Sequence, residues 1–273
     1  MKKRKLNLVT ILASIILLTV LTMALFPGWF THFDPLEVSI PEKLLGPSST
    51  HILGTDEYGR DIFCRIVYGA RTTISVGIGT ALLAALIGVP LGLIAGYYGG
   101  IVDNIIMRLM DAFQSFPSML LAILLSTIAN PSAKTLILTI SIVSFPRFAK
   151  LVRSNVLSIK QQDYIAAAKV SGVSSTYMLF RGLLPNCVSV IVVQFSMLTA
   201  TAILIEASMS FIGLGIQPPD PAWGSMLFYA NKYINKSLTY ALGPILTIFL
   251  VVLSLNLLGD ALRDWLDPKS KNR

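Results

Sequence analysis

Five stretches of this 273-residue chain contain no charged residue and are each long enough to cross a lipid bilayer. They are residues 6–26, 72–102, 112–133, 182–205 and 237–259, which hold 21, 31, 22, 24 and 23 residues. About 20 apolar residues suffice for one helix to cross the hydrocarbon core. A soluble core rarely needs one such stretch, so five of them exclude a soluble enzyme, a disordered regulator and a fibrous protein. The sequence therefore predicts an all-α polytopic membrane protein.

The remaining composition narrows the classes of partner. The formal net charge is +8, but the basic residues lie at the ends of the apolar stretches instead of forming one patch, so no nucleic-acid partner is expected. The two cysteines, Cys64 and Cys187, do not indicate a disulfide framework. The two histidines, His32 and His51, are 19 residues apart and outside any H-E-x-x-H motif. No metal site is expected in this chain.

Six membrane spans are predicted. The first apolar stretch follows four basic residues, but it is longer than the 7–15 residues typical of a secretory leader, which favours a retained anchor. A shorter uncharged stretch, 135–146, becomes a span if Arg147 and Lys150 lie at its end and extend to the interface. The predicted spans are 6–26, 74–98, 113–130, 134–152, 186–206 and 238–259. The predicted parts of the chain are 1–71 (anchor and outer loop), 72–268 (transmembrane domain) and 269–273 (short tail).

The distribution of Lys and Arg predicts the orientation in the membrane. With the N-terminus inside, the cytoplasmic segments hold 15 Lys and Arg and the outer segments hold 7. Positive residues favour the cytoplasmic side, so both termini are expected in the cytoplasm, with a long cytoplasmic loop at 147–181. Arg108 and Asp111, three residues apart, are expected to pair at this surface.

The apolar stretches also bear on the source of energy. None of the five contains Asp, Glu, Lys, Arg or His, whereas ion-driven carriers usually place such residues near the middle of the membrane. No G-x-x-x-x-G-K-[ST] motif is present, so this chain is not expected to bind ATP. No nucleophile–base pair indicates catalysis. These observations disfavour an ion-coupled carrier and an integral-membrane enzyme, and they favour an external motor.

A row of small residues predicts close helix packing in the second span. Gly88, Gly92, Gly96 and Gly100 are spaced by four residues and lie on one helix face. Such a face lets two helices approach closely, and the second helix belongs either to this chain or to a partner subunit.

Uncharged polar residues in the last two long apolar stretches have two interpretations. They line a wet pathway or make hydrogen bonds between helices. The residues concerned are Gln194, Ser196, Thr199, Thr201, Ser254 and Asn256.

The long loop contains the sequence QQDYIAAAKVSGVSSTYMLFRGLLPN at residues 161–186. Asp163 is a plausible N-cap, and Ala166, Ala167 and Ala168 favour a helix. Gly172 can end that helix in the left-handed conformation, Ser174 or Ser175 can cap a second short helix, and Pro185 fits the first turn of the next span. The pattern favours a short helix that docks into a groove of a soluble partner over one that lies on the membrane.

This loop resembles the EAA loop of permease subunits of bacterial binding-protein-dependent ABC importers, whose pattern is E-A-A-x3-G-x9-I-x-L-P. Ala167, Ala168, Gly172, Leu184 and Pro185 match, whereas Ala166 and Gly182 replace the Glu and the Ile. The stretches LGTDEYGRD (53–61), MRLMDAFQSFP (107–117), SFIGLGIQPPDPAWG (210–224) and NLLGDALRDWLDP (256–268) resemble the second permease of the oligopeptide, dipeptide and nickel group.

The resemblance also implies the fold, the location and the other subunits of the transporter. It implies the type I importer permease fold in the bacterial inner membrane, contacting lipid, with a second homologous permease. Two ATP-binding subunits would hold ATP and Mg, and an extracytoplasmic solute-binding protein would deliver the cargo. Residues 163–176 would form the coupling helix, and Asp163, Ala166, Ala167, Ala168, Gly172, Leu184 and Pro185 would couple the chain to the ATPase. Small peptides are the expected cargo and nickel or a metal chelate is the alternative. An ion-coupled secondary transporter is the alternative of another class.

The outer segment 218–233 contains three prolines and then AWGSMLFYANKY. It predicts a rigid turn followed by a short amphipathic helix. We expect this helix to contact the binding protein, with anchoring at the membrane surface as the alternative.

Overall fold

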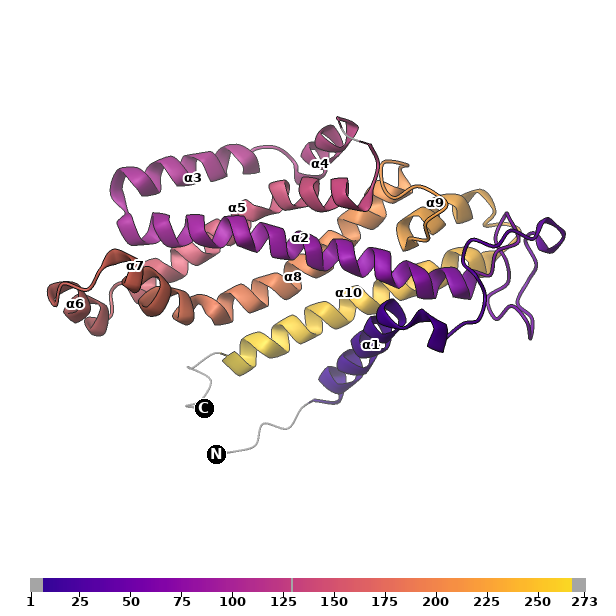
Figure 1. Ribbon diagram of the computed structural model, residues 1–273, viewed down its shortest axis with the longest axis horizontal. Helices are drawn as coiled ribbons and strands as arrows, with labels where there is room; N and C mark the ends of the chain where they lie inside the picture. The colour runs from indigo at the N-terminus through magenta and orange to yellow at the C-terminus, as the bar shows by residue number, and fades with distance from the viewer. Residues whose placement is uncertain (1–6, 129, 267–273) are drawn as a thin grey trace.

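The computed structural model describes residues 7–266 apart from residue 129, and these residues form a bundle of helices (Figure 1). The only β-structure among them is one isolated bridge between Thr55 and Asp61. The elements are α1 Leu8–Leu25, η1 Pro27–Trp29, η2 Ile40–Glu42, α2 Ile62–Tyr98, α3 Gly100–Gln114, α4 Ser118–Thr127, α5 Ala133–Ile159, α6 Asp163–Val170, α7 Ser175–Tyr177, η3 Met178–Leu183, α8 Leu184–Phe211, α9 Trp223–Lys232 and α10 Leu238–Leu266. The predicted tail at 269–273 and the basic residues 2–5 lie outside the described residues.

Five helical segments are long and apolar enough to cross a membrane: α1, α2, α5, the continuous run from α7 to α8, and α10. α3 and α4 pass the same test only as a pair, which is bent by 81°. The bend lies before Pro117, because a residue that precedes proline is disfavoured in the helical conformation. The described residues therefore contain five spans, or six if the bent pair is one span.

The helix that precedes the third predicted span begins earlier than the sequence indicates. The sequence placed 99–111 in a cytoplasmic loop and began the span at 113, but α3 already starts at Gly100. The charges of Asp103 and Asp111 suggested a solvated loop. In the structure both carboxylates form ion pairs with residues of α5, so these residues are compatible with a packed helix.

α2 is the central element of the bundle. It packs against α1, α3, α5, α8, α9 and α10. Figure 1 shows it running along the long axis, with α6 at one end of the molecule and the loop of residues 27–61 at the other. Its 37 residues correspond to about 55 Å at a rise of about 1.5 Å per residue. α2 is therefore longer than the roughly 30 Å hydrocarbon core.

The predicted boundary between residues 71 and 72 falls inside α2, which begins at Ile62. The Asp61 side chain caps the helix by accepting a hydrogen bond from the Cys64 backbone N–H at 2.6 Å. The charge of Arg65 interrupted the apolar pattern, but its guanidinium is 3% exposed and donates to the Pro35 carbonyl oxygen at 2.7 Å. The folded loop thus encloses the first turns of the helix.

A buried cluster of charges ties the 27–61 loop to the bundle. The Asp56 carboxylate is fully buried and lies 2.6 Å from Arg60 Nε and 3.6 Å from Arg65 Nε. The Tyr240 hydroxyl of α10 donates to Glu57 Oε2 at 2.7 Å. These contacts place the LGTDEYGRD stretch where the loop, α2 and α10 meet.

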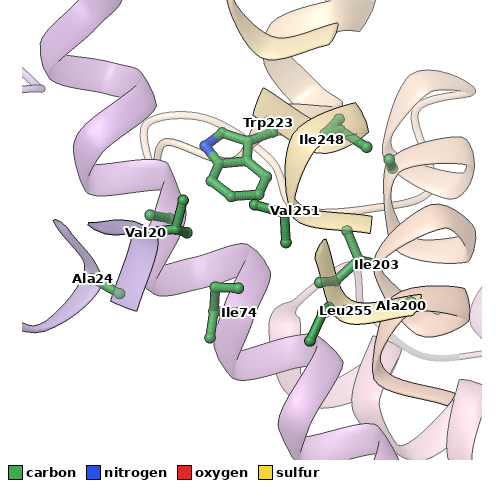
Figure 2. Packing of buried hydrophobic residues seen from close by; sticks show 11 residues of the cluster. Val20, Ala24, Ile74, Ala200, Ile203, Trp223, Ile248, Val251 and Leu255 are labelled. Atoms are coloured by element: carbon green, nitrogen blue, oxygen red, sulfur yellow. The ribbon is translucent and has the colours of Figure 1, made fainter. Parts of the chain in front are cut away.

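The apolar core at this end forms around Trp223 of α9. Figure 2 shows the Trp223 side chain among Val20 of α1, Ile74 of α2, Ile203 of α8 and Val251 of α10. Trp223 is fully buried, and its Nε1–H donates to the Ile66 carbonyl oxygen at 2.9 Å.

The expected short helix at 218–233 is present as α9, but its apolar face does not lie on the surface. Trp223, Met226 and Ala230 are buried inside the chain. The expected contact of this helix with a binding protein, or with the membrane surface, therefore does not use these three residues. Amphipathicity alone does not distinguish burial within a chain from contact with another molecule.

Candidate functional site

The segment α6–α7, residues 163–177, projects from one end of the bundle (Figure 1). The predicted N-cap is displaced by one residue: Gln162 holds the N-cap position without a side-chain hydrogen bond, and Asp163 is the first helical residue. A carboxylate in the first turn still interacts favourably with the positive end of the helix dipole. α6 therefore forms as expected, with a different residue as its cap.

Gly172 ends α6 as the sequence predicts. Its φ is +76°, in the left-handed region. The Gly172 N–H donates to the Lys169 carbonyl oxygen and the Val173 N–H to the Ala168 carbonyl oxygen, both at 3.2 Å. This pair of bonds is the Schellman motif, and Ala168 and Val173 both pack on the same apolar cluster. The chain therefore leaves α6 in a defined direction.

The second short helix and its return to the bundle are also defined locally. The Ser174 hydroxyl oxygen caps α7 by accepting from the Tyr177 backbone N–H at 3.4 Å. Tyr97, near the end of α2, donates its hydroxyl to Ser175 Oγ at 3.2 Å. Leu184 and Pro185 form the first turn of α8, so the segment continues into a membrane-spanning helix.

The two sides of α6 differ. Ile165 is 5% exposed and packs with Met178, Val156 and Ile159 in an apolar cluster formed by α2, α5, η3 and α8. On the other side Ala166 and Ala167 are exposed, and Val170 is 90% exposed. α6 is thus anchored to the bundle through Ile165 and exposes Ala166 and Ala167 outward.

The glycine seam of α2 packs against α5 of the same chain. A Cβ added to Gly88 would lie 2.5 Å from the Phe145 carbonyl oxygen, and one added to Gly92 would lie 2.4 Å from the Ala149 carbonyl oxygen. A Cβ on Gly96 would lie 2.7 Å from Val156 Cγ1. These close approaches assign three of the four predicted glycines to contact within the chain.

Gly100 does not belong to the seam, which corrects the prediction for this residue. α2 ends at Tyr98, and Gly99 and Gly100 have φ values of +69° and +54°. No atom lies within 4 Å of a Cβ added at Gly100. The four-residue spacing continues through Gly100, but the chain turns there because glycine readily adopts positive φ.

Two ion pairs join α3 to α5. Arg153 Nε lies 2.5 Å from Asp103 Oδ1, and its second nitrogen donates to Oδ2 at 2.5 Å. Lys150 Nζ lies 2.6 Å from Asp111 Oδ1. The expected pairing of Asp111 with Arg108 is therefore wrong, because the carboxylate pairs with α5 instead.

A polar cavity of about 660 Å³ lies beside these ion pairs. Three of the six predicted pathway residues line it: Gln194 and Thr201 of α8 and Asn256 of α10. Four polar residues that the sequence analysis did not assign to a pathway also line it, namely Gln114, Arg147, Lys150 and Ser154. The cavity therefore collects hydrogen-bonding groups from α3, α5, α8 and α10.

The other three predicted pathway residues do not line this cavity. Ser196 donates to the Leu255 carbonyl oxygen of α10 at 2.9 Å, which is the interhelical bond considered as the alternative. Thr199 is 3% exposed and donates to the Phe195 carbonyl oxygen of its own helix. Ser254 is 1% exposed. These residues serve packing within the chain.

A helical spacing could have identified the cavity. On α5, Arg147, Lys150, Leu151 and Ser154 lie at i, i+3, i+4 and i+7, and on α8 Gln194, Met197, Leu198 and Thr201 repeat that spacing. Such positions share one helix face. The predicted span ends at residue 152, shortly after Arg147 and Lys150, but α5 continues to Ile159.

One buried ionisable residue was also missed. The uncharged stretch ends at residue 205, but α8 continues to Phe211 and contains Glu206, which is fully buried. Ser210 Oγ donates to Glu206 Oε1 at 2.8 Å. The apolar stretches contain no charged residue, but the helices that include them extend further and do contain charged residues.

Comparison with known proteins agrees with this geometry. Residues 88–272 match the model of the family described as binding-protein-dependent transport system inner membrane component. The dipeptide transport system permease protein of Alkalihalophilus pseudofirmus is 42% identical over 271 residues, which cover 99% of this chain and 89% of the relative. The glutathione transport system permease protein of Pectobacterium atrosepticum is 44% identical over 265 residues, covering 97% and 88%.

A solved structure shows the same fold. A chain of the MetNI methionine ABC transporter in an inward-facing conformation superposes with a TM-score of 0.62 at 18% identity, covering 74% of this chain and 96% of that chain. The all-helical, type I importer permease fold expected from the resemblance is thereby confirmed. The chain is a multi-pass membrane protein that belongs to the binding-protein-dependent transport system inner membrane component family.

Proposed function

We propose that this chain is one of two permease subunits of an ATP-driven importer that moves small peptides across the bacterial inner membrane. The relatives described above are named for dipeptide and glutathione transport, which supports peptide over nickel as the cargo. The observation that carries the proposal is the exposed, anchored helix α6 at the end of an apolar bundle whose family is that of importer permeases.

In this proposal α6 is the coupling helix and lies in a groove of an ATP-binding subunit. The small exposed side chains of Ala166 and Ala167 allow close approach of the partner, and Asp163 begins the helix. Ala168 and Gly172 fix its end through the Schellman motif. Leu184 and Pro185 connect the segment to α8.

Motion of α6 would reach the membrane through Ile165. This side chain packs with residues of α5, η3 and α8, so a displacement of α6 also displaces these elements. Closure of the two ATPases, which would bind ATP and Mg, is then transmitted as a rigid-body movement that switches the permease pair between inward-facing and outward-facing forms. This subunit itself supplies the path and hydrolyses no ATP.

The path runs along the polar cavity, with Gln194, Thr201 and Asn256 as lining residues. A second homologous permease completes the wall, and an extracytoplasmic solute-binding protein delivers the peptide. Both termini and α6 face the cytoplasm in this proposal, because the predicted inner segments contain more Lys and Arg than the outer ones.

Uptake into proteoliposomes tests the proposal. The complete importer contains both permeases, both ATPases and the binding protein. It is expected to accumulate a labelled dipeptide only when ATP is supplied on the side of the membrane where the ATPases lie. Proton or sodium gradients without ATP should give no accumulation. Gradient-driven uptake by this chain alone would support an ion-coupled carrier and refute the proposal. ATP-driven uptake of nickel with no uptake of dipeptides would refute the proposed cargo.

A further inference from the structure

One of the two cations that line the polar cavity has no counter-ion among the residues that the structure describes. Lys150 pairs with Asp111 at 2.6 Å and also donates to Gln114. Arg147, which lines the same cavity, is exposed and makes no ion pair or hydrogen bond within residues 7–266 apart from 129. Some charged residues line the cavity, and others pair with a residue that does. None of them neutralises the Arg147 guanidinium.

The position of Arg147 along α5 makes this charge informative. Arg147 is the fifteenth of the 27 residues of α5 and follows Pro146, so it lies near the middle of the helix. A charge within a membrane-spanning helix is costly unless it faces water or a partner, and it usually marks a substrate path.

The surroundings of Arg147 match a peptide. Gln194, Asn256, Thr201 and Ser154 offer uncharged donors and acceptors to a peptide backbone on the walls of the same cavity. Its volume of about 660 Å³ lies within the range of roughly 300–1,000 Å³ found for small-molecule sites. A guanidinium binds a carboxylate through two parallel hydrogen bonds.

We propose that Arg147 binds the side-chain carboxylates of acidic peptides in this cavity and makes the permease favour anionic over cationic cargo. The proposal rests on the peptide-import function proposed above. It locates a selective step in the permease, after release of the cargo from the binding protein. A phospholipid headgroup offers a similar anion, and the experiment separates the two sources.

The test compares three dipeptides, Ala-Glu, Ala-Ala and Ala-Lys, in proteoliposomes that contain the complete importer. Binding-protein affinity for each dipeptide is measured separately, and each is supplied with the binding protein saturated. The wild type is expected to transport Ala-Glu faster than Ala-Lys. Arg147→Gln is expected to lower this rate ratio at least fivefold, whereas Arg147→Lys, which keeps the charge, retains at least half of it.

Arg108→Gln is the matched control. Arg108 is also an exposed arginine, it lies on α3, and it does not line the cavity. This variant should keep the wild-type ratio. If Arg147→Gln does not assemble with the other subunits, Arg147→Lys, which keeps the charge, is compared with the wild type instead.

Three results would overturn the inference. They are a wild type that does not prefer Ala-Glu, a ratio unchanged in Arg147→Gln, and an equal fall in transport of all three dipeptides. The equal fall, if it varies with the anionic lipid content, would assign Arg147 to a headgroup. A wild-type importer that transports none of the dipeptides with ATP would instead refute the proposed function.

Discussion

At the scale of single residues, Gly172 controls the exit from α6 through its backbone alone. Its φ is +76°, and a Cβ at this position would meet no atom within 4 Å. The left-handed conformation costs an L-residue roughly 1–2 kcal/mol, and a β-branched residue is a stronger outlier there. We expect Gly172→Val to lower peptide uptake at least tenfold while membrane insertion and ATP hydrolysis persist, because the Schellman bonds that orient the segment are lost. Uptake and ATPase activity are measured on the same proteoliposomes.

Gly172→Asn provides the control for this prediction. Asparagine adopts the left-handed conformation more readily than other residues with a side chain, and the space around the position is open. The Asn variant should keep most of the coupled uptake. Wild-type uptake in the Val variant, or an equal loss in both variants, would contradict the backbone explanation.

The same residue scale shows which parts of the site could be predicted from the sequence. Gly172 and Ser174 were predictable because helix caps depend on local conformation. Polarity alone could not separate Thr201, which lines the cavity, from Thr199, which does not, because both hydroxyls donate to a carbonyl oxygen of their own helix. That distinction depends on which face of α8 meets α5. In the sequence it is indicated only by the seven-residue spacing between Gln194 and Thr201, which places the two residues on one helix face.

At the scale of helices, the contact between α2 and α5 depends on the absence of side chains. A Cβ on Gly92 would lie 2.4 Å from the backbone oxygen of Ala149. A backbone atom cannot rotate away, so Gly92→Ala must separate the two helices. Overpacking of this kind costs about 1–3 kcal/mol. We expect the unfolding temperature of the purified permease in detergent to fall by several degrees.

Gly28→Ala is the matched substitution, since no atom lies within 4 Å of a Cβ at Gly28. It should leave the unfolding temperature of the permease unchanged. Equal unfolding temperatures for the Gly92 and Gly28 variants would show that the seam tolerates a methyl group and would contradict the close packing described above.

The contact of α9 with α2 depends on one buried hydrogen bond. Trp223 Nε1–H donates to the Ile66 carbonyl oxygen, and the indole is fully buried. Trp223→Phe removes the donor and leaves unfilled volume, which together cost about 1–3 kcal/mol or more. We expect a lower unfolding temperature than for Trp29→Phe, because Trp29 is 75% exposed. If both variants unfold at the same temperature, α9 does not stabilise the bundle.

At the scale of the whole molecule, the sequence predicts the apolar spans better than their ends. Four of the five uncharged stretches lie in helices long enough to cross a membrane, namely α1, α2, α8 and α10, whereas the stretch 112–133 contains the short helix α4 and the ends of α3 and α5. The early starts of α2 and α3 could not be predicted, because Arg65 and Asp103 read as exposed charges until their partners across the bundle are known. Long-range ion pairs and hydrogen bonds of this kind leave no periodic pattern in a sequence.

The orientation of the whole molecule in the membrane is the last prediction, and the two native cysteines make it measurable. Cys64 and Cys187 are both fully buried, so a membrane-impermeant maleimide should give little background. Ser171→Cys lies at the exposed end of α6, and Ser49→Cys lies in the exposed 27–61 loop. We expect labelling of the Ser49 variant in right-side-out vesicles and of the Ser171 variant only in inverted vesicles, because the ATPases act from the cytoplasm. The reverse pattern would place α6 outside, where no ATP-binding subunit can reach it.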